Sequence, residues 1–263
     1  MTDSFTEQGR FFLKDSIRRQ VDMRRTDQGR GVPPPPLEQP FPPEAPRIDL
    51  TPPGSWQGIA PVSVEQAIRC RESQRHFTPT SLSLDELSFL LWSTAGLKKR
   101  LNQATALRTV PSAGARHPLE TYLGLLRVDG LAPGFYRYLP LEHQLLFLFQ
   151  EERQEEKMTA AARDQGFVGQ SAVTLYWVAV PYRTEWRYGV ASAKVIALDA
   201  GHICGQLYLA CQAIGAGTCG VAAYDQEATD QLLRLDGVEE FTVYLAPVGK
   251  IQDQTAAKPP EGE

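Results

Sequence analysis

The first residues that could do chemistry are Arg71, Ser73 and Arg75, which follow a predicted helix that begins with a Ser63/Gln66 capping box. If this helix continues, Arg71 and Arg75 share one face, because they are four residues apart. Two guanidiniums with a hydroxyl between them suit a phosphate monoester, since arginine offers charged donors in a fork. A solvated helix end, where basic residues offset the helix dipole, explains the same local pattern.

A second candidate lies in residues 110–120, which join a basic run to a predicted strand at residues 121–128. Pro111 and Pro118 fix the backbone dihedral φ, and Gly114 permits backbone angles closed to other residues. We call residues 111–118 the small-residue loop, after Ser112, Ala113, Gly114 and Ala115. A rigid loop with short side chains lets a flat object lie against its main chain. That object is either a ligand or another part of the fold.

A third candidate is the cationic and aromatic stretch of residues 182–189, which follows a predicted buried strand at residues 171–180. Arg187 and Tyr188 are neighbours in it, and a structural turn docked on the sheet explains the stretch.

The glycine pattern at residues 215–220 matches the letters of a dinucleotide-binding fingerprint, Gly-x-Gly-x-x-Gly. That fingerprint needs a strand before it and a helix that starts within it. Here a helix precedes it, so we interpret it as a loop that leaves a helix C-terminus.

The elements that must position these residues have clear patterns. The longest helix is predicted over residues 192–214, and its small residues Ala200, Gly201 and Gly205 permit close helix approach. It is either the central helix of the domain or a dimer seam. Further helices are predicted from the Ser83 capping box to Gly96, over residues 151–165 and over residues 225–235. Further strands are predicted over residues 134–138, 144–149 and 240–249. Residues 98–100 are expected to form a basic loop.

Composition excludes several classes of function. The chain has 263 residues, 42% of them hydrophobic, and a formal net charge of -4, so a polyanion such as nucleic acid is a poor partner. Its four cysteines form no Cys-x-x-Cys pair and its four histidines no His-Glu-x-x-His motif, which favours free thiols over a metal site. We find no signal-peptide core and no apolar run long enough to span a bilayer, and therefore expect a cytoplasmic protein.

Three segments are expected along the chain. Residues 1–60 form a proline-rich N-terminal arm, in which residues 33–36 should adopt polyproline II. Such an arm could be an SH3-type ligand, but we favour packing along its own protein or a sister subunit. Residues 61–250 form the domain, and residues 251–263 a polar tail.

Four stretches together resemble the nitroreductase-like FMN flavoproteins, and more closely the SagB-type dehydrogenases of thiazole/oxazole-modified peptide biosynthesis. They are residues 71–77, residues 111–120 with Pro-Ser-Ala-Gly and Pro-Leu-Glu, residues 198–202 with Asp-Ala-Gly-His, and residues 214–225, with Val248-Gly249 at the end. The resemblance implies an α+β, nitroreductase-like fold with a central, mostly antiparallel sheet flanked by helices. It also implies an intertwined homodimer with FMN at each interface.

The resemblance implies roles for ten residues, which are Arg71, Ser73, Arg75, Pro111, Ser112, Ala113, Gly114, Ala222, Ala223 and Lys250. The first three should hold the FMN phosphate, the ribityl chain and the N1/O2 edge of the ring. The four from Pro111 should line the ring system from the neighbouring subunit. The two alanines should place main-chain groups near N5 and O4, although many relatives have glycine near Ala223. Lys250 is a further phosphate candidate.

The chemistry of the residues agrees with this resemblance. A flat tricyclic ring needs a slot walled by main chain, and phosphate needs fixed positive charge, which arginine supplies at any relevant pH. A cation near N1/O2 stabilises the anionic reduced flavin, while FMN itself carries the redox chemistry.

The reaction is less specified. In azoline oxidases of the SagB branch, a Lys-Tyr pair ahead of the long helix is thought to assist proton removal, and the corresponding pair here is Arg187-Tyr188. Arginine stays protonated at ordinary pH, so it cannot be a general base, although it can orient an anion or support a Tyr188 phenolate. We therefore favour a general FMN oxidoreductase that draws hydride from NAD(P)H and passes it to a small acceptor. The alternatives are an azoline dehydrogenase with a cyclodehydratase partner, and a catalytically silent docking subunit.

Overall fold

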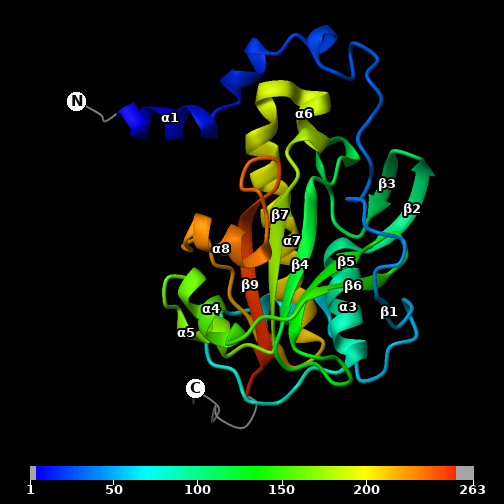
Figure 1. Ribbon diagram of the computed structural model, residues 1–263, viewed down its shortest axis with the longest axis vertical. Helices are drawn as coiled ribbons and strands as arrows, with labels where there is room; N and C mark the ends of the chain where they lie inside the picture. Colours follow the sequence, from blue (N-terminus) through cyan, green and yellow to red (C-terminus); the bar gives the residue numbers. More distant parts are fainter. Residues whose placement is uncertain (1–3, 253–263) are drawn as a thin grey trace, which may run out of the picture.

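The computed structural model describes residues 4–252 of the chain. Its centre is a seven-stranded sheet with the order β1-β6-β5-β4-β7-β9-β8, in which every neighbouring pair is antiparallel (Figure 1). The strands are β1 (Arg47–Asp49), β4 (Leu119–Leu125), β5 (Gly134–Leu139), β6 (Gln144–Phe149), β7 (Val173–Ala179), β8 (Ala216–Thr218) and β9 (Phe241–Lys250). The expected α+β fold is thus confirmed.

Helices cover both faces of this sheet. They are α1 (Ser4–Leu13), α2 (Val64–Cys70), α3 (Leu84–Ala95), α4 (Gln154–Ala161), α5 (Gly166–Gly169), α6 (Tyr182–Tyr188), α7 (Ser192–Gln212) and α8 (Gln226–Leu233). The sheet supplies Leu123 and Leu175 to a core shared with α3 and α7. Their chain neighbours Tyr122 and Tyr176 join a second core with α4, α5 and α8. Successive side chains of a strand point to opposite faces, so one strand serves both cores.

Most predicted elements are present. The long helix begins at Ser192 as predicted, and the hairpin of β5 and β6 pairs as expected. The capping box before α3 is complete, because the Ser83 hydroxyl accepts from the Glu86 N–H and the Glu86 carboxylate accepts from the Ser83 N–H. The glycine pattern after α7 leads into strand β8, and Gly215 has φ +59°, typical of a helix C-terminus.

Three predicted elements are wrong in type or extent. The expected loop at residues 98–100 lies in a hairpin of β2 (Leu97–Asn102) and β3 (Thr105–Arg108). Five consecutive residues of β2, from Lys98 to Asn102, are exposed, and Leu101 is the one apolar residue among them, so no apolar alternation marks the strand. The predicted turn after β7 is the short helix α6, and the helix expected over residues 151–165 is interrupted between α4 and α5.

The N-terminal arm packs along its own chain, as favoured from the sequence. Its strand β1 extends the sheet beside β6, and Leu37 and Leu50 are buried. Nearer the N-terminus the arm lies on α6, where the Trp186 indole donates to the Val32 carbonyl at 2.9 Å. The predicted tail falls largely outside the described residues.

Neither a membrane-spanning helix nor a metal-binding cluster occurs in the part of the chain that the structure describes. No helix between residues 4 and 252 combines the length and apolar character needed to cross a bilayer. Within the same residues, no three His, Cys, Asp or Glu side chains gather closely enough to hold a metal ion. All four cysteines are free, and Cys204, Cys211 and Cys219 are buried.

Candidate functional site

The arginine cluster, which we define as Arg71, Ser73 and Arg75, lies on an extended segment rather than on a helix. Helix α2 ends at Cys70, and Arg71 already has extended backbone angles. The shared helical face considered from the sequence therefore does not form. Arg71 and Ser73 both approach Tyr208 of α7, whereas Arg75 lies over Phe167 of α5. A bridge between Ser73 and Thr218 docks this segment beside β8.

Tyr208 of α7 organises one end of the arginine cluster. The Arg71 guanidinium lies over its ring, 5.4 Å from the centroid, and its hydroxyl lies 3.1 Å from the Ser73 hydroxyl. The same hydroxyl accepts from the Gly220 N–H at 2.8 Å. The sequence had not singled out Tyr208, whose only signal was a hydroxyl within an apolar helix.

Both arginines of the cluster keep donors available. Arg75 lies over Phe167 of α5, 6.0 Å from the ring centroid. Neither Arg71 nor Arg75 has a carboxylate partner among the ion pairs of residues 4–252. Both are exposed, so their N–H groups can bind an anion such as a phosphate monoester. This donor set fits the tail of FMN.

Ala222 and Ala223 follow Gly220 in the chain, and the Gly220 N–H donates to Tyr208 beside the arginine cluster. Val221 is held by β9 through its N–H, which donates to the Leu245 carbonyl at 2.8 Å. Both alanines are exposed, and the Ala223 carbonyl accepts from the Gln165 amide at 2.7 Å. Their main chain can therefore face a ligand that lies on the arginine cluster.

Lys250 has other partners. Its ammonium donates to the Glu86 carboxylate of α3 and to the Ile214 carbonyl behind α7. The Lys250 side chain is 20% exposed. Its charge is thus already compensated, which makes it a weaker phosphate ligand than the two arginines.

The small-residue loop is anchored at several points. The Ala113 N–H donates to the Asp199 carboxylate of α7 at 3.2 Å, and the His117 N–H donates to the Ser112 hydroxyl at 2.8 Å. Gly114 has φ +61°, a conformation in which glycine carries no steric penalty. Asp199 was in the sequence motif, but its role in holding this loop was not predicted.

Arg187 and Tyr188 lie directly against Gly114. A Cβ atom at Gly114 would be 2.6 Å from the Tyr188 hydroxyl and 2.9 Å from the Arg187 Nε. The missing side chain is therefore what allows this pair to lie on the loop. The Arg187 Nε is buried without a hydrogen-bond partner in the described residues. Arg187 therefore places a fixed positive charge beside the loop, and its Nε–H group can still donate a hydrogen bond.

Burial shifts the pKa values of two titratable groups around the loop, His117 and Asp199. Burial, aided by Arg108, lowers the pKa of His117 to about 3, so this imidazole is neutral at working pH. Burial also raises the pKa of Asp199, although hydrogen bonds from Ser112 and Ala113 oppose the shift. His117 therefore orients the loop, through the Ala106 carbonyl 3.1 Å from its Nε2, rather than shuttling protons.

The predicted site residues form two groups within one chain. The small-residue loop with Arg187 and Tyr188 contacts α7 at Asp199, whereas the arginine cluster with Ala222 and Ala223 contacts it near Tyr208. Nine helical residues separate these two anchors, which places them about 13 Å apart along the helix axis. A single chain thus presents the two groups at different ends of α7.

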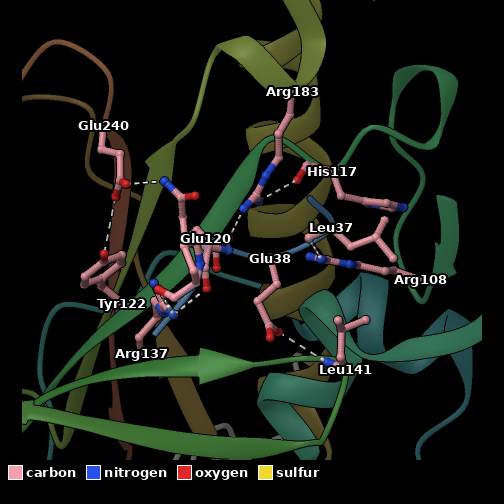
Figure 2. A network of polar contacts seen from close by, with 12 residues as sticks. Leu37, Glu38, Arg108, His117, Glu120, Tyr122, Arg137, Leu141, Arg183 and Glu240 are labelled. Atoms are coloured by element: carbon pink, nitrogen blue, oxygen red, sulfur yellow. Dashed lines mark hydrogen bonds and ion pairs between the residues drawn. The ribbon is translucent and has the colours of Figure 1, made fainter. Parts of the chain in front are cut away.

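A network of buried charges lies beneath the small-residue loop, and no sequence pattern predicted it. Figure 2 shows Arg183 reaching from α6 to Glu120 on β4, with Arg108 and Arg137 near the same carboxylate. Glu120 is 3% and Arg183 1% exposed. Burial opposes ionisation of Glu120, but these three arginines outweigh it and hold the pKa of its carboxyl below the ordinary value. Glu38 of the arm also points into this network.

The chain is similar in sequence to known proteins. The model described as the nitroreductase family matches residues 68–250. A Methanocaldococcus jannaschii protein, MJ1384, whose name assigns it to the nitroreductases, is 30% identical over 192 residues, which are 73% of this chain and 93% of the relative.

Solved structures share the fold. A Ralstonia eutropha structure named for the nitroreductases has a TM-score of 0.65 and 24% identity, over 84% of this chain and 99% of the other. An Anabaena variabilis structure named likewise has a TM-score of 0.65 and 19% identity, over 80% of this chain and 42% of the other. The Escherichia coli microcin synthetase McbBCD complex, with truncated pro-MccB17 bound, contains a chain with a TM-score of 0.58 and 19% identity, covering 78% of each chain.

Proposed function

Because the chain belongs to the nitroreductase family, we propose that it is an FMN-dependent oxidoreductase that transfers hydride between the flavin and a small or peptide-derived substrate. The observation that carries this proposal is the arginine cluster. Its two guanidiniums have no carboxylate partner in the described residues, and a serine hydroxyl lies between them. Arg71 and Arg75 would hold the phosphate and Ser73 the ribityl chain. NAD(P)H is the proposed hydride donor.

Each group of site residues has a distinct task in this proposal. When bound, FMN would supply the hydride-accepting ring. The main chain of Pro111 to Gly114 walls the slot, while Ala222 and Ala223 offer main-chain groups on the other side. Arg187 provides a cation that stabilises negative charge developing in the slot, and Tyr188 can orient a substrate hydroxyl or carbonyl.

We propose that a homodimer completes the slot. The resemblance places the small-residue loop and the arginine cluster of one slot on different subunits, and within one chain the two groups lie about 13 Å apart along α7. The exposed side of α7 supports this arrangement. Leu198 is 52% exposed, and a Cβ atom added at Gly201 or Gly205 would meet nothing within 4 Å. Small residues on an exposed apolar helix permit close approach of a second helix.

Membership of the SagB-type branch is also proposed, with azoline dehydrogenation as the second candidate function. The motifs of the chain resemble that branch, and its fold is shared with a chain of the microcin synthetase complex. The position of Arg187 argues for the general oxidoreductase, because arginine cannot remove a proton at ordinary pH. Genomic neighbours that encode a short precursor peptide and a cyclodehydratase would favour the azoline reaction.

The decisive experiment is an absorbance spectrum of the purified protein, followed by anaerobic addition of NADH and then NADPH. The proposal expects a flavin spectrum that bleaches when a nicotinamide donor reduces the ring. A colourless protein that gains no FMN on titration would contradict the proposal and would favour the catalytically silent docking subunit.

A further inference from the structure

The arm is held at one place by its main chain. We call residues 37–40 the strap. The Arg108 guanidinium donates to the Leu37 carbonyl at 3.0 Å, and the Arg137 guanidinium donates to the Gln39 carbonyl at 2.8 Å. In the other direction, the Gln39 N–H donates to the Glu120 carboxylate at 2.9 Å. Three strands of the body, β3, β5 and β4, therefore bind the strap through its peptide groups (Figure 2).

The carboxylate that binds the strap also binds helix α6. Arg183 donates to the same oxygen of Glu120 that accepts from Gln39, and a second Arg183 nitrogen donates to the His117 carbonyl at 3.3 Å. The Glu120–Arg183 pair thus connects the strap, the end of the small-residue loop and α6.

Arg183 controls where the candidate catalytic pair lies. It is four residues before Arg187 on the same helix, which places the two side chains one turn apart on one side. Arg187 and Tyr188 in turn lie against Gly114, within 3 Å of the position where its Cβ would be. A shift of Arg183 therefore moves this pair relative to the loop.

A network of this kind is better suited to fixing position than to adding stability. The guanidiniums of Arg108, Arg137 and Arg183 are each at least 92% buried, and each has a buried Nε without a partner in the described residues. Apolar packing of similar volume often stabilises a core as well as a buried ion pair does. Charge-assisted hydrogen bonds, however, define the distance and direction between groups closely.

We propose that the strap is a positioning element of the active site, whose peptide groups fix Glu120 and Arg183 and thereby hold Arg187 and Tyr188 against Gly114. This inference rests on the proposed function for its catalytic part only. Its structural part, that the strap determines the order of α6, holds or fails without any flavin.

The test is a pair of substitutions at one position. Gln39→Pro removes the N–H that binds Glu120. The arm already has proline at residues 33–36 and at position 40, next to Gln39. Gln39→Ala is the matched control, because it removes the same side chain and its contact with Glu240 but keeps the N–H. The difference between the two variants therefore measures the peptide hydrogen bond.

The first measurement is amide hydrogen exchange of the full chain, without added flavin. Loss of a hydrogen bond to a buried charge should speed exchange in peptides covering residues 182–188 by about tenfold or more in Gln39→Pro. Gln39→Ala should stay within about twofold of the parent chain. Equal exchange in both variants at α6 would overturn the proposal. If Gln39→Pro does not accumulate as folded protein, Glu120→Gln is measured instead and should give the same pattern.

The second measurement separates positioning from general damage. With FMN and NAD(P)H, Gln39→Pro should lower kcat by about tenfold or more, while the dissociation constant for FMN changes less than about threefold, because the arginine cluster lies elsewhere on α7. A purely structural role would change both constants, or neither. Faster exchange at α6 with an unchanged kcat would overturn the catalytic part. If the parent chain binds no flavin, the proposed function fails, and the exchange result alone decides the structural part.

Discussion

Gly114→Ala tests the contact between the small-residue loop and the candidate catalytic pair. The added methyl group would be placed 2.6 Å from the Tyr188 hydroxyl and 2.9 Å from the Arg187 Nε. Ordinary contact begins near 3.4 Å, so Tyr188 must retreat by about 0.8 Å. Both clashing atoms belong to side chains rather than to the main chain, and these side chains will move before the main chain does.

The expected effects on stability and activity differ in size. A left-handed conformation costs an alanine about 1–2 kcal/mol, which is the expected loss in the free energy of unfolding. Misplacement of catalytic groups by nearly an ångström costs far more in rate, and we expect kcat to fall by roughly 10- to 100-fold. The substitution should therefore be mild for the fold and severe for turnover.

Urea unfolding and steady-state turnover of NAD(P)H measure the two effects. Gly130→Ala is the matched control, since Gly130 also has a positive φ, +79°, and an added Cβ there meets nothing within 4 Å. It should lose similar stability and keep its kcat. If Gly114→Ala loses stability as the control does but turns over like the parent chain, the reasoning about Arg187 and Tyr188 is refuted.

Three further predictions concern the cofactor, the dimer and the arm. Replacing Arg71 and Arg75 together by alanine should raise the dissociation constant for FMN at least about 100-fold in a fluorescence titration. The dissociation constant for riboflavin, which lacks the phosphate, should rise much less, and equal losses would contradict phosphate binding. Gly201→Arg should convert a dimer to a monomer in light scattering at micromolar concentration, and a monomeric parent chain would exclude the α7 seam. Burial, with Glu120 and Glu142, raises the pKa of Glu38 to about 7, so its stabilising contribution is present below pH 4.5 and is lost as pH rises through 7. Glu38→Gln should therefore gain up to roughly 3 kcal/mol relative to the parent chain between pH 5 and 8 in urea unfolding, and parallel pH profiles would count against it.

Local sequence patterns predicted the elements whose signals lie within the element or at its ends. Strand β7 is buried at every position, and its run of β-branched and aromatic residues indicated this directly. Helix α3 has a capping box at its start and a glycine at its end. Such signals need no knowledge of distant residues, which is why these elements were predicted with the right type and nearly the right bounds.

The conformation of the arginine cluster depends on tertiary contacts instead. Residues 71–78 contain no glycine or proline, so the sequence has no signal for the end of α2 at Cys70. The helix ends because the next residues dock beside β8, through the Ser73–Thr218 bridge and the hydrogen bond from the Gln74 N–H to the Thr218 carbonyl at 3.0 Å. A partner more than a hundred residues away cannot be inferred from local spacing.

The buried charges escaped prediction for a related reason. Burying a charge costs several kcal/mol unless a partner compensates it, so a sequence-based analysis places arginine and glutamate in water. The partners of Glu120 are Arg183 and Gln39, which are 63 and 81 residues away in the sequence. Only the fold brings them together, and it does so with the proline-rich arm, whose packing was expected but whose contact with Glu120 was not.

Helix α7 connects these observations. Its inner side holds the small-residue loop through Asp199, its far end holds the arginine cluster through Tyr208, and its outer side presents Gly201 and Gly205 without neighbours. Within one chain the two groups lie about 13 Å apart along this helix. If two copies pack through α7, the loop of each can reach the cluster of the other, and the same glycines that permit the close approach also determine whether the slot closes. Dimer formation and flavin binding would then be two consequences of one packed surface, so a substitution at Gly201 should impair both although it touches neither group of site residues.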